Sequence, residues 1–304
     1  MLSNLFYIIT FSLSIVVSIV NLLFGFIIII VVIINRQCRT VTNLLMCNTA
    51  AATSIYAVLQ IFSAGYGLRD DWLHNQPLCV FRAYCYVTVC IIVSGSYALQ
   101  SISRLFFAVL YKYKYLLTWR IHWFMIIANY LMAIVGPIVP VFVGDGYEFE
   151  VDSRLCMATT KVFYSSMLAV TIAYLIPLSI VTIIYGIIFH RARQSARRVV
   201  AFVPIRASNT PTSNPTAAKP NLKRELKLMT NIIILVGILI CAGIPYLIMV
   251  LWHATLRQPP PEPFYLLTMV NISVFFVVKL IVLFCMSKEV KHITVEYLRK
   301  CGRF

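Results

Sequence analysis

Charged residues are scarce in this sequence. Asp, Glu, Lys and Arg together make up 12% of its 304 residues, whereas hydrophobic residues make up 61% and the mean hydropathy is +0.87. Soluble globular domains carry about 25% charged and about 45–50% apolar residues. The composition therefore excludes an ordinary soluble domain and indicates that lipid surrounds much of the chain.

Motifs for catalysis and metal binding are also missing. The sequence contains no His-Glu-x-x-His, no Gly-x-Ser-x-Gly and no pair of acidic residues within an apolar segment. A hydrolytic or metal-dependent membrane enzyme needs ligands, or a nucleophile with a base, at such spacings. Internal repeats and inverted halves are absent as well, which weakens a transporter assignment. We therefore expect no enzymatic activity, no cofactor and no metal site.

The apolar residues form seven blocks instead, each long enough to cross a bilayer as a helix at about 1.5 Å per residue. No block shows the alternation with period two that a transmembrane β-barrel requires. Backbone groups in lipid must find partners within the segment, so the blocks predict an all-α, seven-transmembrane helix bundle. The predicted spans are approximately 6–34, 41–64, 79–110, 121–142, 162–189, 226–252 and 264–285.

Basic residues collect in alternate loops. Most of the 26 Lys and Arg residues lie at 36–39, 104–120, 191–227 and 288–303, whereas most acidic residues lie in the other loops. Because basic loops stay on the cytoplasmic side, the C-terminus is predicted in the cytosol and the N-terminus outside the plasma membrane. The net charge of +16 then faces anionic lipid headgroups, and nucleic acid is not an expected partner.

Two segments outside the spans have features of their own. Residues 190–225 contain four prolines among Ser, Thr, Asn and basic residues, which predicts a disordered cytoplasmic loop. Residues 288–300 place apolar side chains among charged ones, as in an amphipathic interfacial helix. Cys301 follows and is a candidate for palmitoylation, with a free thiol as the alternative. Residues 1–304 are expected to form a single domain.

Only two of the nine cysteines lie where an oxidising environment reaches them. Cys79 begins the third span, and Cys156 lies in the loop between the fourth and fifth spans. A disulfide between them would tie this loop to the outer end of the third span. Two unpaired thiols are the alternative.

Landmarks of one receptor family then occur in order and at family spacing. They include an arginine at the inner end of the third span, a proline and tyrosine eight residues apart in the fifth, and an acidic residue 20 positions before a proline in the sixth. The landmarks are Asn21, residues 43–50, Trp72, Cys79, Arg104, Cys156, Pro177, Tyr185, Glu225 and Pro245. From residue 6 to 301 the chain resembles a rhodopsin-like, class A G-protein-coupled receptor.

The resemblance implies a mechanism and two partners, an extracellular ligand and a heterotrimeric G protein. Ligand binding would shift helices 5 and 6 and open a cytoplasmic cavity for the G protein. Arg104 would pair with Glu225 in the inactive state, and Tyr185 would reach Arg104 in the open state. Pro177 and Pro245 match the family's helix 5 and helix 6 prolines, and Pro245 would allow a kink. Separate solvation of the Arg104 and Glu225 charges is the alternative.

Several family positions are altered, which indicates a divergent member. Ser103 and Leu105 flank the arginine in place of Asp and Tyr, and Thr53 replaces the helix 2 aspartate that binds sodium. Gly243 occupies the place of the helix 6 tryptophan, and residues 280–284 lack the proline and tyrosine of Asn-Pro-x-x-Tyr. Activation is therefore expected to differ in detail.

The loop that ends at Cys156 gives an indication of the class of ligand. Residues 144–156 alternate aromatic or apolar with acidic side chains, which predicts a β-hairpin lid. Within the family such a lid resembles peptide receptors, and the acidic excess favours a cationic peptide or organic ligand. A merely solvated loop is the alternative.

Candidate pocket residues are Arg82, Tyr84, Tyr86 and Tyr246, each of which is equally well explained by packing or by an interfacial position. Tyr86 stands where amine receptors carry an aspartate, so an amine ligand is not expected. Lys279 lies within the last span, where a lysine is costly and marks a site of functional interest. A channel or transporter of seven spans is the alternative function, although its path usually needs several ionisable residues within the membrane.

Overall fold

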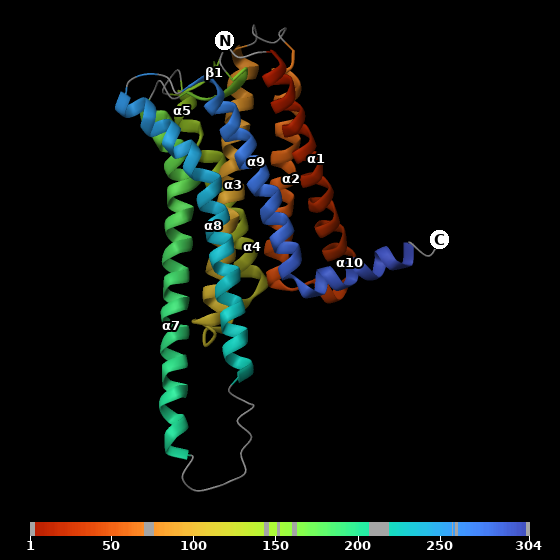
Figure 1. The fold of residues 1–304 in the computed structure, drawn as a ribbon, viewed down its shortest axis with the longest axis vertical. Coiled ribbons are helices and arrows are strands. Elements are labelled where there is room, and N and C mark those ends of the chain that lie inside the picture. Colours follow the sequence, from red (N-terminus) through yellow and green to blue (C-terminus); the bar gives the residue numbers. More distant parts are fainter. Residues whose placement is uncertain are drawn as a thin grey trace.

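The computed structural model describes residues 4–69, 76–142, 146–150, 153–159, 163–206, 219–256, 258 and 261–301. Seven of its helical segments are long and apolar enough to cross a membrane. Figure 1 shows them packed side by side in one bundle. The predicted seven-transmembrane fold is confirmed, with segments at Asn4–Ile34, Val41–Gly67, Pro77–Ala108, Trp119–Phe142, Phe163–Arg191, Ile233–Leu256 and Pro263–Met286.

Two of the spans are not continuous α-helices. The fourth changes from α4 to α5 around Pro137, which has no N–H to continue the helical ladder. The fifth contains a π-helical turn, Thr171–Leu175, just before Pro177. The helices are α1 (Asn4–Ile34), α2 (Val41–Gly67), α3 (Gln76–Ala108), α4 (Trp119–Val135), α5 (Ile138–Phe142), α6 (Phe163–Val170), α7 (Ile176–Arg206), α8 (Lys219–Leu256), α9 (Glu262–Met286) and α10 (Lys288–Cys301).

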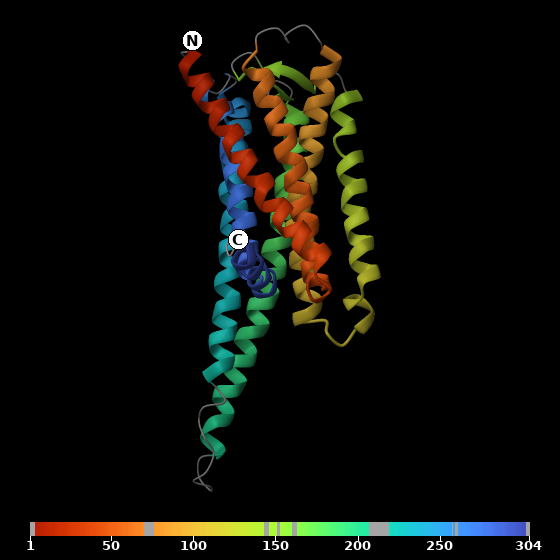
Figure 2. The same ribbon diagram turned by 90° about the vertical axis from the view of Figure 1, so that its right-hand side faces the viewer.

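Helices α7 and α8 extend far beyond the other helices at one end of the bundle, as Figures 1 and 2 show. The prediction of a disordered loop over 190–225 is therefore wrong for most of it, because α7 continues to Arg206 and α8 begins at Lys219. These extensions are rich in Ala, Arg, Lys and Leu, which lose little side-chain entropy in a helix. Residues 207–218 lie outside the described part.

A two-stranded antiparallel sheet caps the opposite end of the bundle. Strand β1 (Tyr147–Glu150) pairs with β2 (Leu155–Ala158), with Tyr147 opposite Ala158. Both of these side chains are buried and pack with Ala83 of α3. The predicted β-hairpin is therefore confirmed.

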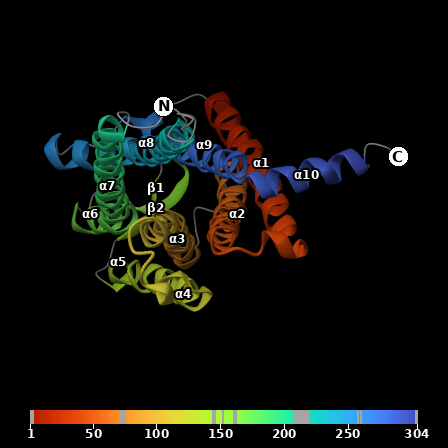
Figure 3. The ribbon, with the colours of Figure 1, turned by 90° about the horizontal axis from the view of Figure 1, so that it is seen from below.

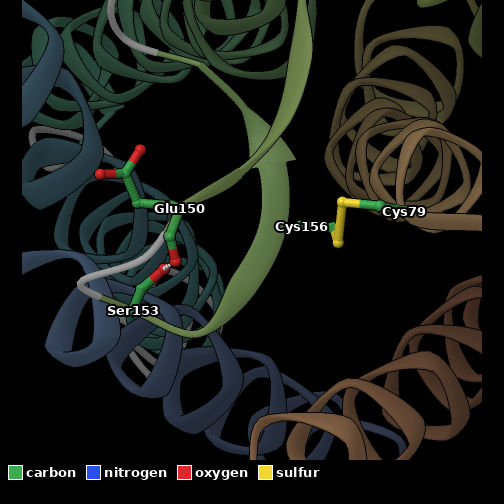
Figure 4. The surroundings of a disulfide bond; sticks show 4 residues. All are labelled: Cys79, Glu150, Ser153 and Cys156. Atoms are coloured by element: carbon green, nitrogen blue, oxygen red, sulfur yellow. Dashed lines mark hydrogen bonds between the residues drawn. A yellow bond between two sulfur atoms is a disulfide. The ribbon is translucent and has the colours of Figure 1, made fainter. Parts of the chain in front are cut away.

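The hairpin is attached to the bundle on two sides. Cys156 forms a disulfide with Cys79 of α3, with 5.3 Å between the Cα atoms, as predicted (Figure 4). Across the bundle, the guanidinium of Arg154 lies 4.4 Å from the centre of the Tyr7 ring and donates a hydrogen bond to Asn4 Oδ1 of α1. The hairpin therefore reaches from α3 to the start of α1 and covers this end of the helices.

Helix α10 leaves the bundle sideways after α9, as Figures 1 and 3 show. The predicted amphipathic eighth helix is confirmed: Val290 is fully buried among residues of α1 and α9, while Lys291 and His292 are exposed. At its start, Glu289 accepts a hydrogen bond from Asn43 Nδ2, which also bonds to the Cys38 carbonyl. These contacts fix α10 to the start of α2.

Candidate functional site

A cavity of about 100 Å³ lies within the bundle, beneath the hairpin. Helices α3, α6, α8 and α9, the π-helical turn and strand β2 all contribute to its wall. Small side chains such as Ala173, Ala242 and Gly243 leave this space open, and sulfur-containing and aromatic side chains surround it. None of the described residues that line it is charged. The cavity therefore suits an uncharged, largely apolar molecule.

A chain of hydroxyl groups adjoins the cavity. The Tyr86 oxygen lies 2.5 Å from the Tyr56 oxygen, which in turn lies 3.0 Å from Ser273 Oγ. Tyr86 also donates toward the Met269 sulfur at 3.2 Å. Sulfur is a weak acceptor, so a ligand oxygen next to Tyr86 would offer this hydroxyl a stronger partner. The chain joins α2, α3 and α9.

The four predicted pocket residues fall into two groups. Tyr86 and Tyr246 line the cavity, and the Tyr246 hydroxyl makes no hydrogen bond to any described residue. Arg82 and Tyr84 are not among the residues that line it. Tyr84 lies two residues from Tyr86, on the opposite side of α3, and donates to the Ile134 carbonyl of α4 at 2.8 Å.

Arg82 lies one turn above Tyr86 and turns toward α2. Its guanidinium carbon is 4.0 Å from the centre of the Tyr66 ring, an arrangement typical of a cation–π contact. Its Nε has no hydrogen-bond partner in the described part of the chain. Arg82 is thus held between helices near the hairpin, away from the cavity wall.

At the α10 end of the bundle, Arg104 donates a hydrogen bond to the Tyr185 hydroxyl at 2.9 Å. Arg104 forms no ion pair with any described residue, and the side chain of Glu225 lies outside the described residues. Ser103, which stands where an acidic neighbour would be, lies 3.0 Å from His122 Nε2 of α4. Among the described residues, no carboxylate takes part in the Arg104–Tyr185 contact.

The backbone hydrogen bonds of helix α8 are interrupted at Pro245. A proline removes the hydrogen bond to the carbonyl four residues earlier, here that of Cys241. Asn271 of α9 donates to this carbonyl at 3.0 Å and replaces the missing partner. Asn271 was not among the residues picked out from the sequence, although a freed carbonyl predicts a polar side chain on an adjacent helix.

Comparison with protein families matches residues 25–287 to the "7 transmembrane receptor (rhodopsin family)". The chain belongs to this family. The match covers six of the seven membrane segments entirely and residues 25–34 of the first. It is a multi-pass membrane protein and a G-protein-coupled receptor.

Two curated relatives of this receptor carry the same name. G-protein coupled receptor 161 of Danio rerio is 24% identical over 195 residues, which cover 62% of this chain and 36% of the relative. G protein-coupled receptor 161 of Bos taurus is 22% identical over 276 residues, which cover 82% of this chain and 52% of the relative. The chain thus spans about half, or less, of the length of these relatives.

Lys279 of the receptor is fully buried in α9, away from the cavity lining. Its amine donates to Ser96 Oγ at 3.1 Å and lies 2.9 Å from the centre of the Tyr97 ring. No carboxylate among the described residues contacts it. Thr53, at the family's sodium-binding aspartate, bonds to the carbonyls of its own helix.

Two predicted residues cannot be assigned surroundings. Cys301 ends α10 and Glu225 belongs to α8, but their side chains lie outside the described residues. Pro177 is buried near the start of α7. Tyr185 is buried and contacts Arg104 from that helix.

Proposed function

We propose that this receptor binds an uncharged, mostly apolar small molecule in the cavity and passes the signal to a heterotrimeric G protein at the α10 end. The proposal depends chiefly on one observation: the described residues of the cavity wall combine apolar side chains with the hydroxyl groups of Tyr86 and Tyr246, and none of these residues is charged. A buried charge without a partner is costly, so the wall disfavours a charged ligand. The basic loops support a plasma-membrane orientation with the hairpin outside.

A cationic peptide is the second candidate, favoured by the acidic residues of the hairpin segment. Glu148 is one of them, and its carboxylate already accepts a hydrogen bond from Thr159 Oγ1 at 2.6 Å. Such a peptide would bind on the outer side of the hairpin, because the interior offers no acidic partner among the described lining residues.

Two panels separate the small-molecule candidate from the peptide candidate. One contains uncharged apolar compounds and the other basic peptides, and both are tested on cells with a second-messenger readout. We expect an activating compound from the uncharged panel. For it, Tyr86→Phe should cost about 1 kcal/mol of binding, or about fivefold in potency, because one hydrogen bond is lost. Tyr84→Phe is the matched control and should leave potency unchanged. Activation by basic peptides alone, with both variants behaving like wild type, would contradict the proposal.

Coupling to the G protein is supported by the position of Arg104 near the end of α3 that lies away from the hairpin, and by its bond to Tyr185. We expect Arg104→Ala to reduce the maximal response without reducing the amount of receptor at the cell surface. Lys112→Ala, an exposed basic residue at the same end, is the control. An unchanged maximal response in Arg104→Ala would remove this part of the proposal.

A further inference from the structure

Residues 240–243 of α8 form one turn immediately before Pro245, and two neighbouring helical segments contact this turn. From α9, Asn271 Nδ2 donates to the Cys241 carbonyl at 3.0 Å and lies 3.5 Å from the Ala242 carbonyl. The turn is therefore bonded to α9 where proline has weakened the ladder of α8 itself. A helix bends most readily where its hydrogen-bond ladder is weakened, so this turn can serve as a hinge of α8.

From the opposite side, Tyr174 reaches the same turn. Its hydroxyl donates to the Ile240 carbonyl at 3.4 Å, and its ring packs directly on Gly243. A Cβ atom at residue 243 would collide with that ring. Only glycine allows this approach, so the Tyr174 ring fills the space beside α8 in which the family's helix 6 tryptophan is missing.

The backbone around Tyr174 departs from regular helix. Thr171–Leu175 is a π-helical turn, in which hydrogen bonds join residues five apart, and such turns inside α-helices are frequent at functional sites. Pro177 follows two residues later and has no N–H of its own to donate. The π-helical turn therefore contains Tyr174, the residue that contacts α8.

Tyr174 also lines the cavity, together with Ala242 and Gly243. Its ring is 8% exposed and stands between the free space and the backbone of α8. Protein interiors are close-packed, so an occupant that presses on this ring displaces the ring, the turn behind it, or both. The displacement would act on α8 next to its proline.

We propose that Tyr174 is the positioning residue that couples occupancy of the cavity to the tilt of α8 about Pro245, while Asn271 holds the hinge from α9. The inference rests on the proposed function, because it names the residue through which that same cavity acts. In this receptor the aromatic side chain beside the hinge would therefore come from the fifth span, because α8 has Gly243 where the family has its helix 6 tryptophan.

Distances between spin labels at Tyr115→Cys and Ile233→Cys test this coupling in the receptor without ligand or G protein. Both native side chains are exposed, and Ile233 lies on α8 on the far side of Pro245 from the hairpin. The free cysteines are replaced by alanine, and the protein is placed in nanodiscs. The readout needs no signalling, so failure of the ligand panel would leave it interpretable.

Tyr174→Ala should shift or broaden the distance distribution, whereas Tyr164→Ala, at an exposed tyrosine of α6, should not. Gly243→Ala should also shift it, because the new Cβ meets the Tyr174 ring. The double variant Tyr174→Ala/Gly243→Ala should match Tyr174→Ala alone, since the ring through which Gly243→Ala acts is gone. General destabilisation would instead make the two effects add, and additive shifts would overturn the proposal.

A substitution that fills the cavity imitates an occupant. Ala169 lines the cavity from α6, and Ala169→Leu adds three carbon atoms there. We expect Ala169→Leu to shift the label distance when Tyr174 is present and to have no effect in the Tyr174→Ala background. An equal shift in both backgrounds, or none in either, would show that Tyr174 does not carry the coupling.

Discussion

At the residue scale, Tyr84 and Tyr86 illustrate how strongly position on a helix decides a role. They have the same side chain and lie two residues apart, yet Tyr86 adjoins the cavity and Tyr84 bonds to α4. The sequence identifies aromatic residues of the third span, but it does not reveal the rotation of that helix in the bundle. This is why two of four predicted pocket residues line the cavity and two do not.

The partners of Tyr86 could not be predicted for a similar reason. Tyr56 and Ser273 come from α2 and α9 and are brought together only by the packing of three helices. Tyr174 and Gly243 likewise meet across the fifth and sixth spans. The sequence shows only that Gly243 stands where the family has a tryptophan. The structure shows that the Tyr174 ring packs against this glycine.

Cys38 leads to a prediction about pH and reactivity. Burial raises the pKa of its thiol above the ordinary value of 9.0, and the negative charge of Glu289 raises it further. Because the thiolate is the reactive form, alkylation by N-ethylmaleimide should begin at higher pH for Cys38 in the folded receptor than in the unfolded chain. Peptide mass spectrometry measures this rate.

The same pKa shift makes a contribution to stability that is present below the unfolded pKa and is lost as the pH rises through the folded value. Glu289→Gln should lower the pH at which Cys38 alkylation begins, since it removes the added negative charge. Equal alkylation rates in the folded and unfolded states, across the pH range, would contradict the prediction.

Lys279 gives a prediction about stability. Its amine is buried with one hydroxyl and one aromatic face and without a carboxylate partner among described residues. A buried ionisable group in a membrane span is costly, and apolar replacements of similar size are often stabilising. Lys279→Met should raise the thermal midpoint by about 2–4 °C, the change expected for about 1 kcal/mol. The exposed Lys288→Met serves as control, and a lowered midpoint for Lys279→Met would show that its amine stabilises the bundle.

At the scale of elements, α8 depends on a neighbour for its hydrogen bonds. Asn271→Leu would leave the Cys241 carbonyl without the donor that replaces the proline's missing N–H. No water replaces the lost donor inside the membrane, and an unsatisfied polar group costs about 1–3 kcal/mol, so the thermal midpoint should fall by several degrees. Val274→Leu, at an exposed position of the same helix, should have little effect. Equal midpoints for the two variants would argue against this role of Asn271.

Elements differ in how far the sequence predicts them. The seven spans follow from apolar length, and the hairpin follows from alternation with period two, so both are confirmed. The extensions of α7 and α8 were missed because the prolines and polar residues of 190–225 suggested a loop. The residues on either side of 207–218 nevertheless form helix, because Ala, Arg, Lys and Leu lose little side-chain entropy there.

At the scale of the whole molecule, two regions lie at opposite ends of one bundle. The hairpin and the cavity beneath it lie at one end, and Arg104, near the other end of α3, contacts Tyr185. The fifth span and α8 both run between these regions, and they carry the π-helical turn and Pro245 respectively. Movement of these two elements is the route by which we expect the cavity to affect the far end.

The most direct test of the cavity as ligand site is the rate at which methyl methanethiosulfonate, a small uncharged reagent, modifies Cys90. This thiol lines the cavity, whereas Cys85 on the same helix does not and serves as internal control. An activating compound should slow modification of Cys90 at least several-fold and leave Cys85 unchanged. If Cys90 reacts equally fast with and without the activating compound, the ligand binds elsewhere and the account is contradicted.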